Sequence, residues 1–139
     1  MREILFRGKR IDNGEWVDGA FLNDGDSAFY ICPVVSDISY GDHGNRIRIG
    51  CWRKVEPSTV GQFTGMTDKN GKRIFEGDIL RIVLTDGHED GPIVWSDIDA
   101  RYHFESPDGC SYGICEWNDL EVIGNIHDNP ELLNGGDAG

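Results

Sequence analysis

The chain has little of what several protein classes require. None of its apolar runs approaches the ~18 residues that a membrane-spanning helix needs. The basic N-terminus is not followed by the apolar core of a secretory signal, and residues 4–6 predict a strand instead. There is no amphipathic helix of ordinary length and no internal repeat. These absences predict a soluble, mainly β protein with little helix, without a membrane segment.

Positive charge is almost absent from the second part of the chain. Residues 1–81 carry 12 Lys and Arg against 12 Asp and Glu, whereas residues 82–139 carry only Arg101 against 13 acidic residues. The net charge of −12 therefore lies in the second part. A solubilising acidic surface explains this distribution. The alternative is an acidic face that binds a basic partner, such as another subunit or a DNA-binding protein, with an affinity that falls as salt rises.

What the chain has in abundance is glycine, at 19 of 139 residues. Residues 60–84 contain the most informative turns. Asn70-Gly71 predicts a two-residue hairpin turn with positive φ at both positions, and residues 76–78 predict a second turn, where Asp78 can accept nearby N–H groups. Residues 79–84 predict a central strand that is covered on both faces, because apolar side chains stand at both odd and even positions.

Short strands separated by turn signals predict a small barrel or roll. Within it, residues 15–17 and 20–22 predict separate strand pieces around Asp18-Gly19, and residues 36–45 and 87–91 predict loops. Helical turns are expected after Glu56 and after Asn129, which is the predicted capping residue. The other predicted strands are residues 2–7, 28–32, 47–49, 93–95, 101–105, 112–117 and 120–126.

Three blocks of sequence, MREILFRGK, VGQFTGMTDKNGKRIFEGDILRI and VIGNIHDNPELL, resemble the YopX-like proteins of phages and prophages. The resemblance implies an SH3-like barrel component and a phage or prophage protein that acts in the bacterial cytoplasm, and it implies no reaction. We divide the chain into a β meander region (residues 1–55), an SH3-like barrel region with a short C-terminal helical turn (residues 56–134) and a flexible tail (residues 135–139). The motif residues, which we interpret as structural, are Gly61, Gln62, Thr64, Gly65, Asp68, Asn70, Gly71, Gly77, Asp78, Gly124, Asn125, Asn129 and Pro130.

Three strings match functional motifs only in part. Residues 109–113 read G-C-S-Y-G, but a nucleophile elbow needs the strand-to-helix corner of a parallel sheet. Residues 65–72 resemble a phosphate loop with five residues between the glycines instead of four, and Arg73 stands where a Ser or Thr should bind magnesium. Residues 68–71 echo a calcium loop without its bidentate Glu. Turns explain all three strings better.

Cysteine and histidine give no firm site. Cys110 and Cys115 have a spacing that zinc sites allow, and Cys32, Cys51 or His103 could complete a set of four ligands. The stronger C-x2-C signature is missing, and reduced cysteines are ordinary core residues. The histidines are scattered in or beside predicted loops. We therefore expect free thiols, no bound metal, no cofactor and no catalytic residues.

A basic cluster near an aromatic side chain invites a second functional hypothesis. Arg46, Arg48 and Arg53 surround Trp52, a combination that binds nucleic acid when bases stack and phosphates are neutralised. Lys69, Lys72, Arg73 and Arg81 add to it. An acidic protein is repelled by a polyanion, so a solvated basic face is the better explanation. The sequence predicts a non-enzymatic interaction module that binds a protein partner or forms a homo-oligomer, with nucleic-acid binding as the alternative.

Overall fold

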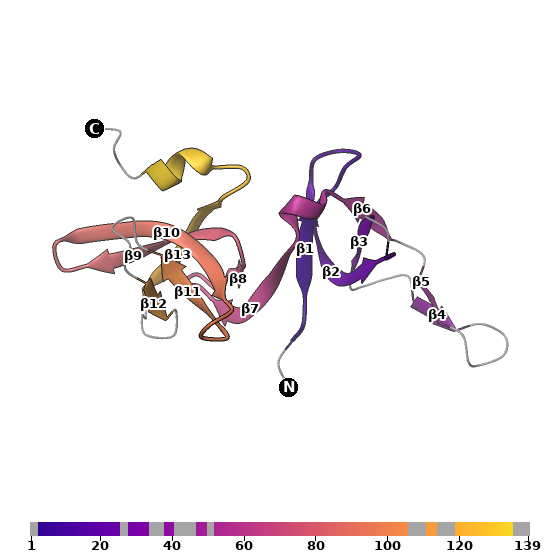
Figure 1. Ribbon diagram of the computed structural model, residues 1–139, viewed down its shortest axis with the longest axis horizontal. Helices are drawn as coiled ribbons and strands as arrows, with labels where there is room; N and C mark the ends of the chain where they lie inside the picture. Colours follow the sequence, from indigo (N-terminus) through magenta and orange to yellow (C-terminus); the bar gives the residue numbers. More distant parts are fainter. Residues whose placement is uncertain are drawn as a thin grey trace. The chain divides into compact units, whose positions relative to one another are not determined.

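The computed structural model is built almost entirely from strands and short turns (Figure 1). It describes residues 3–25, 28–33, 38–40, 47–49, 52–105, 111–113 and 119–134. Within these ranges the helical elements are short 3-10 turns, so the predicted mainly β class is confirmed. None of them is long and apolar enough to cross a membrane. The chain forms two compact units, residues 1–62 and residues 63–139.

The first unit is a curled antiparallel sheet. Its strands are β1 (Phe6–Lys9), β2 (Trp16–Asn23), β3 (Phe29–Pro33) and β6 (Arg53–Val55), in the sheet order β6-β3-β2-β1. Strand β7 (Gly61–Thr67) pairs with β1 through its first two residues. The 3-10 turn η1 (Pro57–Thr59) starts at a proline, as predicted. Strands β4 (Ile38–Tyr40) and β5 (Ile47–Ile49) form a separate pair, so part of the predicted loop 36–45 is a strand.

Gly19 corrects one prediction for this unit. Asp18-Gly19 was expected to separate two strand pieces, but β2 runs through it without a break. A Cβ atom on Gly19 would lie 1.9 Å from the carbonyl oxygen of Cys32 in β3. The glycine therefore permits a close approach of two strands. The first strand also begins later than predicted, at Phe6, and Ile4 is 63% exposed.

The second unit contains a five-stranded antiparallel sheet of order β12-β11-β10-β9-β13. Its core consists of apolar side chains from five strands, namely Ile74, Leu80, Ile82, Ile93, Phe104 and Leu120. The elements are β8 (Arg73–Phe75), β9 (Asp78–Leu84), β10 (Gly87–Ser96), β11 (Arg101–Glu105), β12 (Ser111–Gly113), β13 (Leu120–Asn125) and the 3-10 turn η3 (Pro130–Asn134). The turn η3 packs against β10.

Strand β9 is central, as predicted, and pairs with β10 and β13. Its face with Leu80 and Ile82 is buried in the core. On the other face Ile79 is buried, but Val83 is 49% exposed. The prediction that both faces are covered is therefore wrong for the second half of the strand.

Strand β10 replaces the loop predicted at residues 87–91. Its first part pairs with β9 up to Pro92, and its last four residues pair with β11. A Cβ atom on Gly91 would lie 2.0 Å from the carbonyl oxygen of Glu105, so β11 crosses close to the strand at this glycine. The strand was not predicted because the side chains of its first residues are polar. These residues form an outward-facing hairpin with β9, where polar side chains are expected.

The turn between β7 and β8 stands where it was predicted, but its type differs. Of Asn70 and Gly71, only Gly71 has a positive φ, at 82°. The N–H of Gly71 donates to the carbonyl of Asp68, and the N–H of Asp68 donates to the carbonyl of Lys72. This is a type I turn followed by a left-handed glycine, a three-residue hairpin loop that needs one positive φ instead of two.

The predicted barrel is not closed in the described part of the chain. In the second unit, the turn of the β7–β8 hairpin meets β13 through one backbone bond from Lys69 to Leu120 and one side-chain bond from Val122 to Asp68. In the first unit, a single bridge joins Arg10 to Val55. Neither contact is a ladder of paired residues, so both sheets stay open and the SH3-like detail is not confirmed.

Candidate functional site

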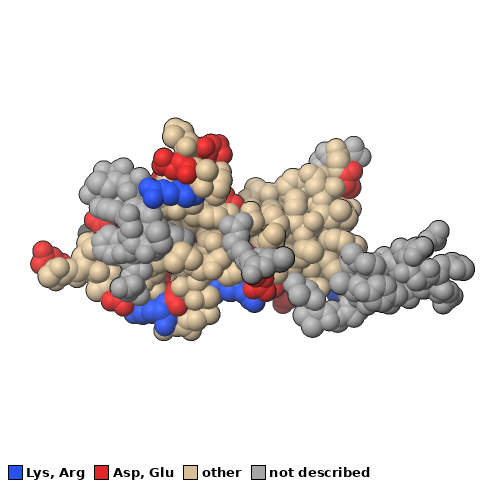
Figure 2. Space-filling model, turned by 90° about the horizontal axis from the view of Figure 1, so that it is seen from below, with Lys and Arg blue, Asp and Glu red and all other residues tan. Residues whose placement is uncertain are grey.

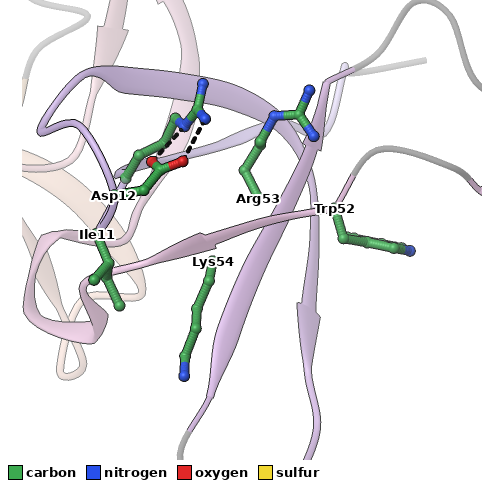
Figure 3. Close-up of a pocket in the computed structure, with 6 residues that line it drawn as sticks. Ile11, Asp12, Trp52, Arg53 and Lys54 are labelled. Carbon is green, nitrogen blue, oxygen red and sulfur yellow. Dashed lines mark hydrogen bonds and ion pairs between the residues drawn. The ribbon is translucent and has the colours of Figure 1, made fainter.

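A basic pocket of about 330 Å³ lies in the first unit (Figure 3). Its walls come from the β1–β2 turn and from β6 with the residue before it. The lining, which defines the basic pocket, consists of Arg10, Ile11, Asp12, Trp52, Arg53 and Lys54. In Figure 3, Ile11 and Lys54 project to one side of β6 and Arg53 projects to the other, as the alternation of a strand requires.

Backbone hydrogen bonds hold the two walls together. The N–H of Ile11 donates to the carbonyl of Lys54, and the N–H of Glu56 donates to the carbonyl of Lys9. The β1–β2 turn is itself fixed, because the N–H of Arg10 donates to Glu15 and the N–H of Gly14 donates to Arg10. The pocket is therefore formed by a hairpin turn that backbone hydrogen bonds hold against β6. Because these bonds fix its walls, the shape of the pocket does not depend on long side chains alone.

Positive charge exceeds negative charge in the pocket. The guanidinium of Arg10 binds the carboxylate of Asp12 through two hydrogen bonds, at 2.9 and 2.7 Å. This hydrogen-bonded pair lowers the pKa of Asp12 and raises the pKa of Arg10. Arg53 and Lys54 add two further cations to the lining, and Trp52 adds an aromatic side chain. The described residues of the lining are cationic, acidic and apolar, so their chemistry suits binding of an anionic group next to an apolar one.

A second surface with unusual exposure is the turn between β10 and β11, residues 97–100, which we call the hairpin tip. Ile98 at this tip is 95% exposed. The indole N–H of Trp95 donates to Asp97 at 2.9 Å, and the backbone N–H of Asp99 donates to Ser96 at 3.1 Å. The tip is therefore ordered by its own hydrogen bonds, although its apolar side chain is open to solvent.

Aromatic side chains support the hairpin tip from the core side. Ile93 pairs with Phe104 in the buried core, and Trp95 pairs with Tyr102 two residues further along. The two rings meet edge to face at 5.0 Å. Because residues two apart share a face of a strand, the Trp95–Tyr102 pair extends the apolar core outward to the tip. Trp95 remains 45% exposed.

The comparison with known proteins is decisive for the family. The family model described as "YopX protein" matches residues 6–134. The chain belongs to the YopX family. It is similar to the crystal structure of protein EF1440 from Enterococcus faecalis, at 28% identity and a TM-score of 0.65, over 96% of this chain and 99% of that chain. No curated protein matches the sequence at a significant level. The resemblance inferred from the three sequence blocks is thus confirmed.

Motif residues of this YopX protein make local structural contacts. Gly61 and Gln62 pair with β1. The hydroxyl of Thr64 donates to the carbonyl of Ile74 at 2.8 Å and accepts the N–H of Met66, within an irregular stretch of β7 where Gly65 has a φ of 90°. The carboxylate of Asp78, which is 1% exposed, accepts the N–H of Phe75 at 2.8 Å.

Asp68 is the motif residue with the widest reach. One carboxylate oxygen accepts the N–H groups of Asn70 and Lys72, and the other accepts the N–H of Val122, 54 residues away. Burial opposes ionisation, but these three N–H groups outweigh it and lower the pKa of Asp68. The residues of the apparent calcium loop thus form a turn that is tied to β13.

The third sequence block forms the corner between β13 and η3. A Cβ atom on Gly124 would lie 2.6 Å from the amide oxygen of Asn129. That oxygen accepts the N–H of Asn125 at 3.2 Å. Asn129 directly precedes η3, as predicted, and its carbonyl accepts the N–H of Leu132, while its side chain binds backward to β13. Pro130 begins the 3-10 turn.

The histidines and cysteines of this YopX protein gather into no metal site in the part that the structure describes. His88 faces Asp90 at 3.1 Å, and His103 lies 3.6 Å from Glu105. Cys32 is buried in β3. Cys51, Cys110 and Cys115 lie outside the described residues, as does Gly109, whereas the last three residues of the G-C-S-Y-G string form strand β12.

The described residues among those proposed for nucleic-acid binding have different surroundings. Arg53 lines the basic pocket, while Arg46 lies outside the described residues. Arg81 binds Asp90 through two hydrogen bonds at 2.9 and 3.1 Å, which compensates its charge. Arg73 stacks over Phe63 at 5.8 Å. Sequence reasoning missed Ile11 as a pocket residue and missed the hairpin tip. For the hairpin tip, the available signal was Ile98, an apolar residue that stands between Asp97 and Asp99 at a turn.

Proposed function

We propose that this YopX family protein is a non-catalytic interaction module that binds another protein or further copies of itself. The observation that carries the proposal is the ordered hairpin tip with an almost fully exposed Ile98. The tip holds Ile98 available for contact with a partner, and Trp95 of the same hairpin is 45% exposed, so the two side chains offer an aliphatic and an aromatic group to an interface. We further propose that the protein is encoded by a phage or prophage and works in the bacterial cytoplasm, on the basis of the family resemblance.

Self-association is the form of this proposal that is easiest to test. Sedimentation velocity of the native chain over a range of concentrations measures the mass of the species in solution. A discrete oligomer is the expected result. Copurification from host cells with a second protein at fixed stoichiometry would support the partner form. A monomer that copurifies with nothing would contradict the proposal.

The alternative function is nucleic-acid binding through the basic pocket. It is favoured by one observation, the presence of Arg53, Lys54 and Trp52 in the lining of one pocket. Gel-shift experiments at low salt with single-stranded and double-stranded DNA test it. Retention of either DNA that is lost in the Lys54→Glu variant would favour this function over the interaction module.

We also propose that the second unit corresponds to an SH3-like barrel that is opened beside β13. Two observations support it. Strand β10 pairs first with β9 and then with β11. The Asp68 carboxylate bridges the opening between the β7–β8 turn and β13. Small barrels commonly divide one bent strand between two sheets in this way.

A further inference from the structure

We infer that the hairpin tip of one copy docks into the basic pocket of another copy. This inference rests on the proposed self-association and names the two surfaces that perform it. The tip presents Ile98 between Asp97 and Asp99, while the pocket presents Ile11 and Lys54 on one side of β6 (Figure 3). Ile98 can meet Ile11, and a flanking carboxylate of the tip can meet the ammonium group of Lys54. The two surfaces are thus complementary in both polarity and charge.

The distribution of charge favours this pairing. Residues 63–139 carry 16 acidic and 5 basic side chains, whereas residues 1–62 carry 9 acidic and 8 basic ones. Two copies of the second unit repel each other, but the tip on that unit is attracted to a basic pocket on the first unit. On the face seen in Figure 2, red acidic groups are scattered over the second unit with blue groups between them. A local contact at the tip therefore fits better than one broad acidic interface.

The same charges argue against nucleic acid as the occupant of the pocket. A polyanion would be attracted by Arg53 and Lys54 but repelled by a chain of net charge −12. It would also leave the exposed Ile98 without a role. A second copy of the chain supplies an anionic group and an apolar group on one turn, and both are what the pocket lining can contact.

The contact is heterologous, because a tip on one copy meets a pocket on another. Such contacts give a closed dimer when two of them form reciprocally, and a ring or an open chain when they do not. In every case each copy has one tip and one pocket. A chain with a damaged tip still offers its pocket, and a chain with a damaged pocket still offers its tip. This property allows the inference to be tested by mixing variants.

The test uses sedimentation velocity of the full chain with the variants Lys54→Glu in the pocket and Asp99→Lys and Ile98→Ser at the tip. Each is expected to weaken self-association at least about tenfold, because one like-charge contact or the loss of one apolar contact suffices. An equimolar mixture of Lys54→Glu and Asp99→Lys chains should associate again, since one native contact remains possible. The double variant Lys54→Glu/Asp99→Lys should also recover, by exchanging the charges.

Matched controls are Lys69→Glu and Ile4→Ser, which change exposed side chains outside both surfaces, and circular dichroism verifies that every variant is folded. Self-association that persists unchanged in the three variants would overturn the inference and leave the proposed function standing. A native chain that stays monomeric up to about 0.1 mM would also overturn it. Copurification of a different protein would then decide the proposed function separately. DNA binding that requires Lys54 would overturn the inference by assigning the pocket to nucleic acid.

Discussion

At the scale of single residues, Asp68 connects the most distant parts of the second unit. Its carboxylate accepts three backbone N–H groups, two from its own turn and one from β13. The acidic side chain is therefore used as an acceptor for the backbone, and an amide cannot replace it fully. Asn offers one acceptor oxygen and two donors, so one N–H group would face another N–H.

We predict that Asp68→Asn lowers the free energy of unfolding by about 2 kcal/mol, the usual size for hydrogen bonds to a charged group. Urea unfolding followed by circular dichroism measures the change. Asp12→Asn is the matched control, because it removes an exposed carboxylate that is paired with an arginine at the surface, and it should leave the unfolding midpoint nearly unchanged. Equal effects of the two substitutions would contradict the role given to Asp68.

The lowered pKa of Asp68 predicts a dependence of stability on pH. The unfolded carboxyl has an ordinary pKa of about 3.9, so it takes up a proton before the folded one does as the pH falls. The stability that ionised Asp68 confers is therefore fully present above about pH 4 and is lost as the pH falls through the folded-state pKa. Asp68→Asn should flatten the acid limb of a plot of stability against pH. An acid limb of unchanged steepness would exclude this contribution.

Ala100, at the hairpin tip, has a positive φ of 51°. This conformation costs an L-residue ~1–2 kcal/mol, and glycine avoids that cost but loses ~0.5–1 kcal/mol in chain entropy. We predict that Ala100→Gly raises the thermal midpoint slightly, as measured by calorimetry. Ala20→Gly in β2, where φ is not positive, should lower the midpoint instead. A fall in both variants would argue against a strained tip.

At the scale of elements, β10 is organised around Gly91. A side chain there would collide with the backbone of Glu105 and come within 3.1 Å of the Phe104 ring. We predict that Gly91→Ala costs about 2–3 kcal/mol, in the range of overpacked cores. Gly71→Ala is the control, since it strains the backbone at a φ of 82° but has open space around it. Its expected cost is about 1 kcal/mol. Urea unfolding of both variants measures the difference.

How far the sequence predicts these elements depends on what determines them. Turns set by local chemistry were predictable, as at residues 76–78, because glycine and aspartate act within a few residues. The central position of β9 followed from its apolar pattern. The first half of β10 was missed, since hairpin pairing with β9 and not burial makes it a strand. The close approach at Gly19 depends on a partner strand that the local sequence does not reveal.

The basic pocket could be predicted only in part for the same reason. Trp52 and Arg53 stood out as a basic and aromatic cluster. Ile11 and Asp12 lie about forty residues earlier in the chain and reach the cluster only because Ile11 hydrogen-bonds to Lys54 across the sheet. Tertiary pairing of this kind has no signal in a single sequence.

At the scale of the whole molecule, the net charge opposes self-association and the exposed tip favours it. Repulsion between acidic second units keeps copies apart, while the tip and the basic pocket attract each other. Salt screens both effects over about 10 Å at 0.1 M. Because the tip and the pocket are in direct contact, we expect the loss of their attraction to outweigh the loss of the repulsion between second units. We therefore predict that rising salt weakens self-association while leaving the folded chain intact by circular dichroism.

Sedimentation equilibrium of the native chain at low and at high salt tests the account most directly. The account predicts a species heavier than the 15.5 kDa chain at low salt, with an association constant that falls at least about tenfold as salt rises. A species of 15.5 kDa at every concentration and salt level would contradict it.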